Sequence, residues 1–197
     1  MLARILTVLL VVIIMGLLVV QRVFSLPPEV LVSVSAIQGD VPYEVGESLP
    51  RGHVLDSGSG YIKLTIEKNT SLWVARDTTV ELHRLYTDEL ALRLKRGRIV
   101  VDHHGDVPLE IVTNQTSHFV LNDLVTFVNY DFLETIHVIP FTGAVQTYIE
   151  ATGEHLLTPA PISIHETDPV TYSPLQINLQ AGDAADFYTW TGVLTQE

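Results

Sequence analysis

The feature that most constrains this fold is an alternation of apolar and polar residues that recurs along the chain after residue 29. Successive side chains of a β-strand point to opposite faces, so period two is typical of half-buried strands. We find no convincing amphipathic helix beyond residue 29. The alternating runs lie at 30–36, 62–66, 90–94, 99–101, 125–127, 136–138, 145–149 and 177–179. The sequence therefore predicts an all-β fold.

Glycines separate most of these runs. Glycine reaches backbone conformations with positive φ at little cost, so it is the usual residue of tight turns. The spacing of turns and strands favours an antiparallel sandwich or a short β-solenoid. We expect structural turns at Gly39, Gly58, Gly60, Gly97 and Gly143.

The predicted β-domain covers residues 29–150, and a different composition follows. Prolines gather at positions 159, 161, 169 and 174, which favours loops or edge strands. Residues 175–188 are expected to form a last hairpin, with its turn at 181–183. Residues 151–197 are thus predicted to be a proline-containing loop and a C-terminal hairpin that packs on the β-domain.

An apolar run from Ile5 to Val20 lies at the amino terminus, framed by the charges of Arg4 and Arg22. Eighteen helical residues span about 27 Å, close to the roughly 30 Å thickness of a bilayer's hydrocarbon core. We interpret residues 5–26 as a transmembrane signal anchor. Pro27 and Pro28 then end the helix.

Two consequences follow for topology. Residues 1–4 are expected to be a short cytoplasmic tail, with the acidic remainder of the chain outside the cell membrane. The alternative is a cleaved signal peptide, but no Ala-x-Ala cleavage motif follows the apolar run.

Composition excludes several classes of protein. The chain has no cysteine, which excludes disulfides, cysteine zinc sites and cysteine nucleophiles. Its net charge of −12 disfavours nucleic acid as a partner. The charge is also uneven, because residues 99–197 contain thirteen acidic residues and no lysine or arginine. That half is either a solvated surface, a surface for divalent cations such as calcium, or a dock for a basic partner.

The order of strands and turns is similar to a known domain pattern. The matching segments are 34–39, 54–64, 69–74, 90–100, 109–113 and 138–145, and the best of them is Val54 to Leu64, with Ser57-Gly58-Ser59-Gly60 at its turn. Together they cover about residues 32–150. On these segments the chain resembles the FecR-like domain, a β-rich extracytoplasmic module of bacterial envelope proteins.

The resemblance implies binding, envelope assembly or signalling with a protein partner in the cell envelope, and no enzymatic activity. The best-known members regulate a sigma factor through a substantial cytoplasmic region ahead of their membrane helix. Only Met1 to Arg4 precede the apolar run here. Four residues cannot supply the roughly 800 Å² that a stable interface needs on each partner, so direct sigma-factor regulation is not expected. Signalling through partner transmembrane helices is a further hypothesis, with Gly16 as one small packing residue.

Motifs of catalysis and cofactor binding are absent from the sequence. Nucleotide-binding glycine loops and the Gly-x-Ser-x-Gly elbow do not occur, so Ser57 is interpreted as part of a turn. No cofactor and no catalytic residue are predicted. The alternative function is a metal-dependent hydrolase or metal-binding protein that uses Asp102, His103 and His104, with His83 or His118 approaching across a sheet. Because neighbouring strand residues face opposite sides, we expect His103 and His104 to be separated unless they lie in a turn.

Three further groups have both a structural and a functional interpretation. Acidic pairs would serve calcium if they were not simply solvated, a basic cluster would serve an anionic glycan or lipid headgroup, and aromatic residues would form either core or a carbohydrate platform. The acidic pairs are Asp88–Glu89, Glu166–Asp168 and Asp183–Asp186; the basic cluster is Arg93, Lys95, Arg96 and Arg98; the aromatic residues are Trp73, Phe187, Tyr188 and Trp190.

Overall fold

The structure is a computed structural model that describes Leu10 and residues 13–16, 27–180 and 184–193. Most of the predicted membrane anchor at 5–26, together with the flanking Arg4, lies outside these residues, and this covers Ile5, Val20 and Arg22. Within the described part of the chain, no helix is both long enough and apolar enough to cross a bilayer.

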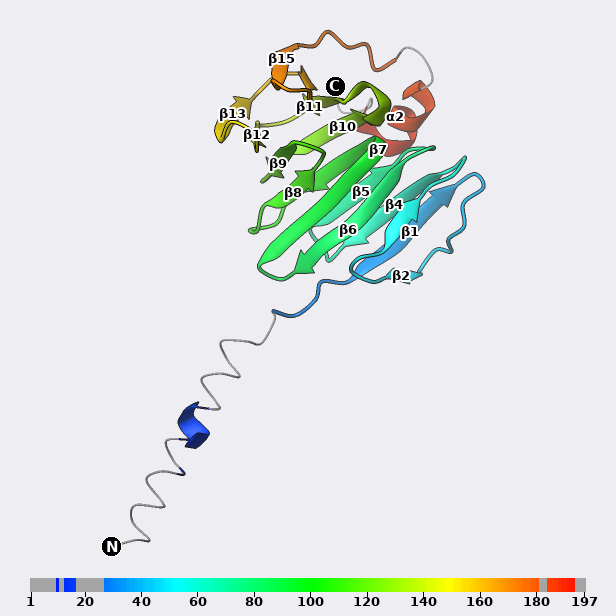
Figure 1. Ribbon diagram of the computed structural model, residues 1–197. Helices are drawn as coiled ribbons and strands as arrows, with labels where there is room; N and C mark the ends of the chain where they lie inside the picture. The colour runs from blue at the N-terminus through cyan, green and yellow to red at the C-terminus, as the bar shows by residue number, and fades with distance from the viewer. Residues whose placement is uncertain (1–9, 11–12, 17–26, 181–183, 194–197) are drawn as a thin grey trace, which may run out of the picture.

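Fifteen strands make up most of the described chain, so the predicted all-β class is confirmed (Figure 1). Strands such as β5 and β6 alternate buried and half-buried residues, because one face of each covers the core. The strands are β1 (Val32–Gln38), β2 (Ser48–Leu49), β3 (Val54–Asp56), β4 (Tyr61–Ile66), β5 (Thr70–Val74), β6 (Thr79–Tyr86), β7 (Glu89–His103), β8 (Leu109–Val112), β9 (Thr116–Val120), β10 (Leu124–Tyr130), β11 (Thr135–Pro140), β12 (Val145–Ile149), β13 (Glu154–Thr158), β14 (Ile162–His165) and β15 (Thr171–Pro174).

The strands form one continuous open sheet in which β7 is shared by two parts. The first residues of β7 pair with β6 and β8, and its last residues pair with β5 and β10. Both parts contribute side chains to one hydrophobic core, so β3, β6 and β8 pack through that core against β1, β4 and β10. The long central strand therefore joins the two parts into one domain (Figure 1).

Two expectations about the strands need correction. Pairing is not antiparallel throughout, because β7 and β8 run parallel, with Leu90 opposite Leu109. The predicted hairpin at residues 175–188 is also wrong. Residues Ala185–Thr191 form helix α2 instead, and a hairpin lies earlier, between β14 and β15. A short 3-10 helix, η1 (Asp131–Leu133), connects β10 to β11.

Helix α2 forms because it has a hydrophobic surface to cover. Phe187 and Tyr188 are buried in a second cluster with Tyr61, Val100 and Leu124, which lie on the sheet face opposite the main core. Figure 1 shows α2, in red, beside the ends of β7 and β10. A helix of seven residues is not stable alone, so this packing determines its conformation.

Glycine is needed for different reasons at the five positions where turns were expected. Gly39, Gly58, Gly97 and Gly143 have positive φ. Gly60 is different, since a Cβ there would lie 2.4 Å from Val41 Cγ1 and 2.7 Å from the Gln38 carbonyl oxygen. Close packing of two chain segments, and not a left-handed backbone, requires glycine at that position.

Candidate functional site

A hollow of about 200 Å³ lies where β4, the β5–β6 loop, β7, β10 and α2 meet. We call it the arginine hollow. Its volume is below the roughly 300–1,000 Å³ of pockets for drug-sized ligands, so it suits one small chemical group. It is lined by Tyr61, Ala75, Arg76, Asp77, Gly97, Arg98, Val128, Asn129, Tyr130 and Phe187.

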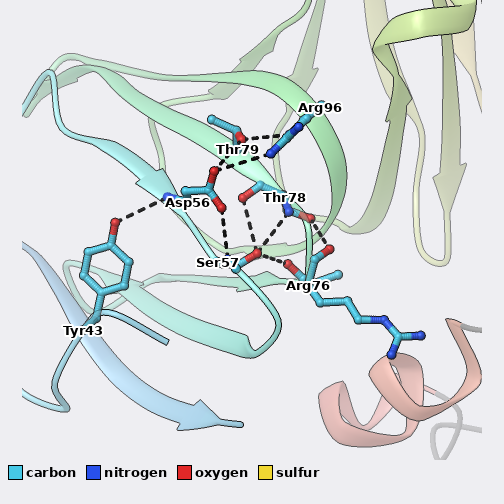
Figure 2. Close-up of polar contacts among 9 residues, drawn as sticks. Tyr43, Asp56, Ser57, Arg76, Thr78, Thr79 and Arg96 are labelled. Atoms are coloured by element: carbon cyan, nitrogen blue, oxygen red, sulfur yellow. Dashed lines mark hydrogen bonds and ion pairs between the residues drawn. The ribbon is translucent and has the colours of Figure 1, made fainter. Parts of the chain in front are cut away.

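Ser57 fixes the loop that carries Arg76 and Asp77 (Figure 2). Its buried hydroxyl donates to the Ala75 carbonyl at 2.5 Å and accepts from the Thr78 N–H at 3.0 Å. The Asp77 N–H also donates to the Gly58 carbonyl at 2.7 Å. The turn that the sequence analysis singled out therefore supports the neighbouring loop, and its serine is engaged with backbone rather than free for nucleophilic attack.

Gly97 lets the same loop lie directly on β7. Its φ is +92°, and a Cβ at this position would lie 2.6 Å from Thr78 Cα. Thr78 Oγ1 accepts from the Arg98 N–H at 3.0 Å, and the Ala75 N–H donates to the Arg98 carbonyl at 3.0 Å. These contacts place Arg98 beside the loop that carries Arg76.

A second layer of contacts surrounds Ser57 toward the surface (Figure 2). Asp56 accepts hydrogen bonds from Thr79 Oγ1 at 3.4 Å and from Arg96 Nη2 at 3.5 Å. Its backbone N–H donates to the Tyr43 hydroxyl at 3.3 Å, and burial raises the pKa of Tyr43. Arg96 is thus paired outside the arginine hollow.

The predicted basic cluster is therefore divided. Arg96 pairs with Asp56 and Lys95 pairs with Glu81 at 3.0 Å, whereas Arg98 lines the hollow. Figure 2 shows the Arg76 side chain extending toward α2. The structure brings Arg76, which was not part of the predicted cluster, to the same hollow as Arg98.

Aromatic residues from α2 and β4 close one side of the hollow. The ring centroids of Tyr61 and Phe187 are 5.5 Å apart, and those of Tyr61 and Trp190 are 5.6 Å apart. Arg98 lies over the Tyr188 ring at 5.4 Å. Burial raises the pKa of Tyr188, and the Arg98 charge partly opposes that rise. Phe187 and Tyr188 are core residues, so the alternative of an exposed aromatic platform does not hold for them.

Two buried polar atoms at the hollow have no hydrogen-bond partner among the described residues: Arg98 Nε and Asn129 Oδ1. The Asn129 amide group donates to the Leu94 and Lys95 carbonyls at 2.7 and 3.1 Å. Its oxygen therefore remains as an unused acceptor. Val128, and not Asn129, lies opposite Arg98, so the Asn129 and Arg98 side chains point to opposite faces of the sheet. Buried polar atoms without partners are rare in folded proteins, and they identify this hollow as the candidate site.

Asp102, His103 and His104 do not form one site. His103 is buried, and its Nε2–H donates to the Val107 carbonyl at 2.8 Å while Nδ1 accepts from the Thr70 hydroxyl at 2.6 Å. Burial lowers the pKa of His103. His104 instead pairs with Asp102 at 2.8 Å on the other, solvent-exposed side. The two histidine side chains are separated, and β7 ends at His103, so His104 lies just beyond the strand.

The remaining candidates for metal binding are also engaged elsewhere. His83 pairs with Glu81, and buried His118 bonds to Thr116 Oγ1 and Thr147 Oγ1 at 3.0 and 2.9 Å. Within the ranges that the structure describes, no three histidine, aspartate or glutamate side chains gather closely enough to hold a metal ion.

Glu166, half of one predicted acidic pair, is buried in the fold. Its carboxylate accepts from the hydroxyls of Thr113 and Thr116 and from the backbone N–H groups of Asn114 and Gln115. Both carboxylate oxygens are thus occupied by donors of the chain itself. Glu166 attaches the segment after β14 to the β8–β9 turn.

Sequence reasoning missed the arginine hollow because its residues are far apart in the chain. Arg76 lies in the turn between β5 and β6, Asn129 is the last residue but one of an apolar strand, and Phe187 lies near the carboxyl terminus. Nothing in their spacing brings them together. The usable indication is Arg98, a member of the predicted basic cluster that directly precedes the apolar residues 99–101 of the same strand.

Comparison with known proteins gives the fold and leaves the family open. No family model matches the chain, and no curated protein matches it. Two crystal structures of a protein from Parabacteroides distasonis ATCC 8503, described as a "putative anti-sigma factor", are similar, each with a TM-score of 0.53 and 16% identity. In each case the match covers 71% of this chain and 64% of that one, so this chain spans less than two thirds of that protein. At such low identity the likeness shows a shared fold.

Proposed function

We propose that this chain is a membrane-anchored, extracytoplasmic β-domain that binds a protein partner in the bacterial envelope and serves a regulatory role there. The observation that carries the proposal is the shared fold with structures described as a putative anti-sigma factor, over 71% of the chain. The FecR-like order of strands and turns at residues 32–150 supports the same role.

The anchor is proposed from the sequence. Residues 5–20 are apolar apart from Thr7 and Gly16, and Arg4 and Arg22 frame them at a separation that suits a bilayer. The acidic, cysteine-free domain that follows would lie outside the cytoplasm. A single-pass topology for the chain accounts for the change in sequence pattern at Pro27 and Pro28, where an apolar run gives way to the alternation of strands.

A binding role, and not an enzymatic one, is favoured by how the reactive side chains are used. Ser57 holds a loop, His103 bridges Thr70 and Val107, and Glu166 holds the β8–β9 turn. Each group already has partners that satisfy its hydrogen bonding. These side chains stabilise the scaffold that a binding surface needs.

Fractionation of cells that express the full-length chain tests the anchor. We expect the chain in the membrane fraction after a high-salt wash, with the β-domain digested by protease added to intact spheroplasts. Recovery of the whole chain in the soluble cytoplasm would refute the anchored topology.

Proximity cross-linking in the native envelope tests the regulatory role. We expect one or a few envelope proteins to be labelled reproducibly. Phe132 and Leu133 are both exposed on η1, and a variant with serine at both positions tests whether this surface contributes to the labelling. A labelling pattern identical to that of an unrelated anchored β-domain would contradict a specific partner.

A further inference from the structure

A second hollow, of about 310 Å³, lies beside α2 at the end of β1 and the start of β4. We call it the tryptophan hollow. Its volume is at the lower limit of the roughly 300–1,000 Å³ of ligand pockets, so it suits one ring or one short chain. It is lined by Gln38, Tyr61, Asp186, Thr189 and Trp190.

Strand register and helix period bring these side chains to one place. Gln38 lies opposite Tyr61 on the β1–β4 ladder, and directly paired strand residues share a face of the sheet. That face is the one that α2 covers. Asp186, Thr189 and Trp190 are spaced i, i+3 and i+4 along α2, so they lie on one side of the helix. The sheet and the helix therefore enclose the hollow from two sides.

The lining of the tryptophan hollow carries one charge, and that charge is negative. Asp186 is the charged residue on the lining, and none of the ion pairs among the described residues involves it. Lys63 lies on the same sheet face, two residues after Tyr61, but its Nζ is over the Trp73 ring, 4.6 Å from the ring centroid. A carboxylate without a paired cation favours a positively charged ligand.

The polar groups of the lining mainly accept hydrogen bonds. A carboxylate such as that of Asp186 only accepts them. The Thr189 hydroxyl donates its hydrogen to the Ala185 carbonyl at 2.8 Å, so its oxygen can only accept from a ligand. The amide oxygen of Gln38 adds a third acceptor. Three acceptors match in number the three N–H donors of a primary ammonium group, which itself accepts no hydrogen bond.

Aromatic rings supply the apolar part of the lining. Trp190 stacks on Tyr61, with ring centroids 5.6 Å apart and ring planes at 26°. Trp190 is half-buried, so part of the indole surface faces the hollow. Such surface packs against the CH₂ groups of an alkyl chain and attracts a cation nearby. The ligand that fits all three properties is an ammonium group on a short apolar stem.

We propose that the tryptophan hollow binds a primary ammonium group carried on a short alkyl chain. Asp186 supplies the opposite charge, and Gln38 and Thr189 accept the remaining N–H groups. Trp190 packs on the chain. The same chemical group occurs in free amines and in lysine side chains. The proposal goes beyond the regulatory role above and does not depend on the anchor, since all residues of the hollow belong to β1, β4 and α2.

NMR on the full-length chain in detergent micelles, labelled with ¹⁵N at tryptophan, tests the proposal at pH 7, where n-butylamine is protonated. The chain has two tryptophans, so the indole N–H signal of Trp190 is identified by its loss in Trp190→Phe. We expect n-butylamine to shift that signal saturably. We expect 1-butanol, which has the same length and no charge, to leave the signal in place.

Variants of the lining test the roles of its residues. Asp186→Asn should weaken the binding of n-butylamine at least about tenfold, because the amide lacks the charge. Gln38→Ala should weaken it severalfold, since one acceptor is lost. Both positions are exposed, so neither variant puts the fold at risk. Asp88→Asn removes an exposed carboxylate in the β6–β7 turn and should leave the binding unchanged.

Competing probes separate the ammonium group from other ligands. Binding of 1-butanol or D-glucose as tight as that of n-butylamine would overturn the assignment of a cation. Tighter binding of choline, whose nitrogen has no N–H, would overturn the hydrogen-bonding scheme. Absence of n-butylamine binding, or binding that survives Asp186→Asn unchanged, would overturn the site itself.

A last probe, Nα-acetyl-lysine N-methylamide, identifies the source of the ammonium group. Binding at least as tight as that of n-butylamine supports a lysine side chain of a protein partner, and weaker binding supports a free amine. None of these results bears on the partner labelling that tests the regulatory role.

Discussion

The amino-terminal part of the domain, residues 30–103, and the carboxyl-terminal part, residues 104–193, are held together differently. Of the sixteen buried polar or charged side chains among the described residues, four lie in the first part and twelve in the second. In the second part Glu166, Thr116, His118 and Thr147 form a continuous buried chain of hydrogen bonds. The first part depends instead on apolar packing and on glycines that let segments approach closely.

The two parts should therefore resist different perturbations. Apolar packing does not titrate, so in the first part acid should act through buried His103 at its end, whereas added volume should be poorly tolerated throughout. A buried hydrogen-bonded network depends on the protonation state of its members and fails when one partner is removed.

Gly97→Ala should cost about 4 kcal/mol of unfolding free energy. The added Cβ would lie 2.3 Å from Thr78 Oγ1 and 2.6 Å from Thr78 Cα, and the residue would keep φ near +92°. Urea unfolding followed by circular dichroism measures it. Gly46→Ala is the matched control, since φ is +90° there with no atom within 4 Å, and should cost about 1 kcal/mol. Equal losses in the two variants would show that close packing is not what requires Gly97.

Glu166→Gln should cost about 3 kcal/mol in the same assay. The carboxylate accepts four hydrogen bonds, and an amide would point N–H donors at donors of Thr113, Thr116 or the β8–β9 turn. Glu154→Gln changes an exposed glutamate on β13 and should alter stability by no more than about 0.5 kcal/mol. A loss for Glu166→Gln as small as that control would remove the contrast between the two parts.

His118 should make the second part sensitive to acid. Burial lowers its pKa from 6.5 to about 3, so the folded chain keeps it neutral while the unfolded chain protonates it below pH 6.5. Its contribution to stability is complete above pH 6.5 and is lost as the pH falls toward 3. Between pH 6.5 and pH 5 the loss should be about 2 kcal/mol.

Urea unfolding at a series of pH values measures this dependence. His118→Gln should have a flatter stability profile over the range, whereas His155→Gln, at an exposed position, should keep the wild-type profile. His103 has a pKa that burial lowers as well, and its contribution remains in both variants. An unchanged slope in His118→Gln would mean that acid acts elsewhere.

Arg51→Gln should change stability least, by about 0.5 kcal/mol or less, with a difference that vanishes at 1 M salt. Arg51 pairs with Glu29 at 3.1 Å, but both side chains are well exposed. Thermal unfolding at low and high salt measures the effect. A loss above about 1 kcal/mol would show that surface ion pairs, and not apolar packing, hold the first part.

Much of the fold could be predicted from local pattern. The alternation at residues 62–66 and 90–94 corresponds to β4 and β7, because a half-buried strand needs that period wherever it lies. The hairpin predicted at 175–188 was wrong because tertiary packing buries Phe187 and Tyr188 in a cluster with Tyr61. The short helix α2 brings both side chains to that cluster. Local sequence carries no information about a surface supplied by another strand.

The candidate site shows the same limit more strongly. The stretch Ser57-Gly58-Ser59-Gly60 predicted a turn, and the lack of a Gly-x-Ser-x-Gly motif predicted that Ser57 is not a nucleophile. Both inferences use only residues that are adjacent in the chain. The hollow it supports unites Arg76 from a loop, Arg98 and Asn129 from two paired strands, and Phe187 from α2. Their assembly depends on strand register and on the position of α2, neither of which any local segment specifies.

Residue type and near neighbours in the chain were enough to predict the strand class and the absence of cysteine chemistry. Three features emerged only from contacts across the fold: β7 joins two parts of one sheet, Glu166 is a buried attachment point, and two arginines line one hollow. The two sets of features differ in how far apart the interacting residues lie in the chain. Side-chain alternation acts over a few residues, whereas burial and pairing are set by contacts between segments distant in the chain.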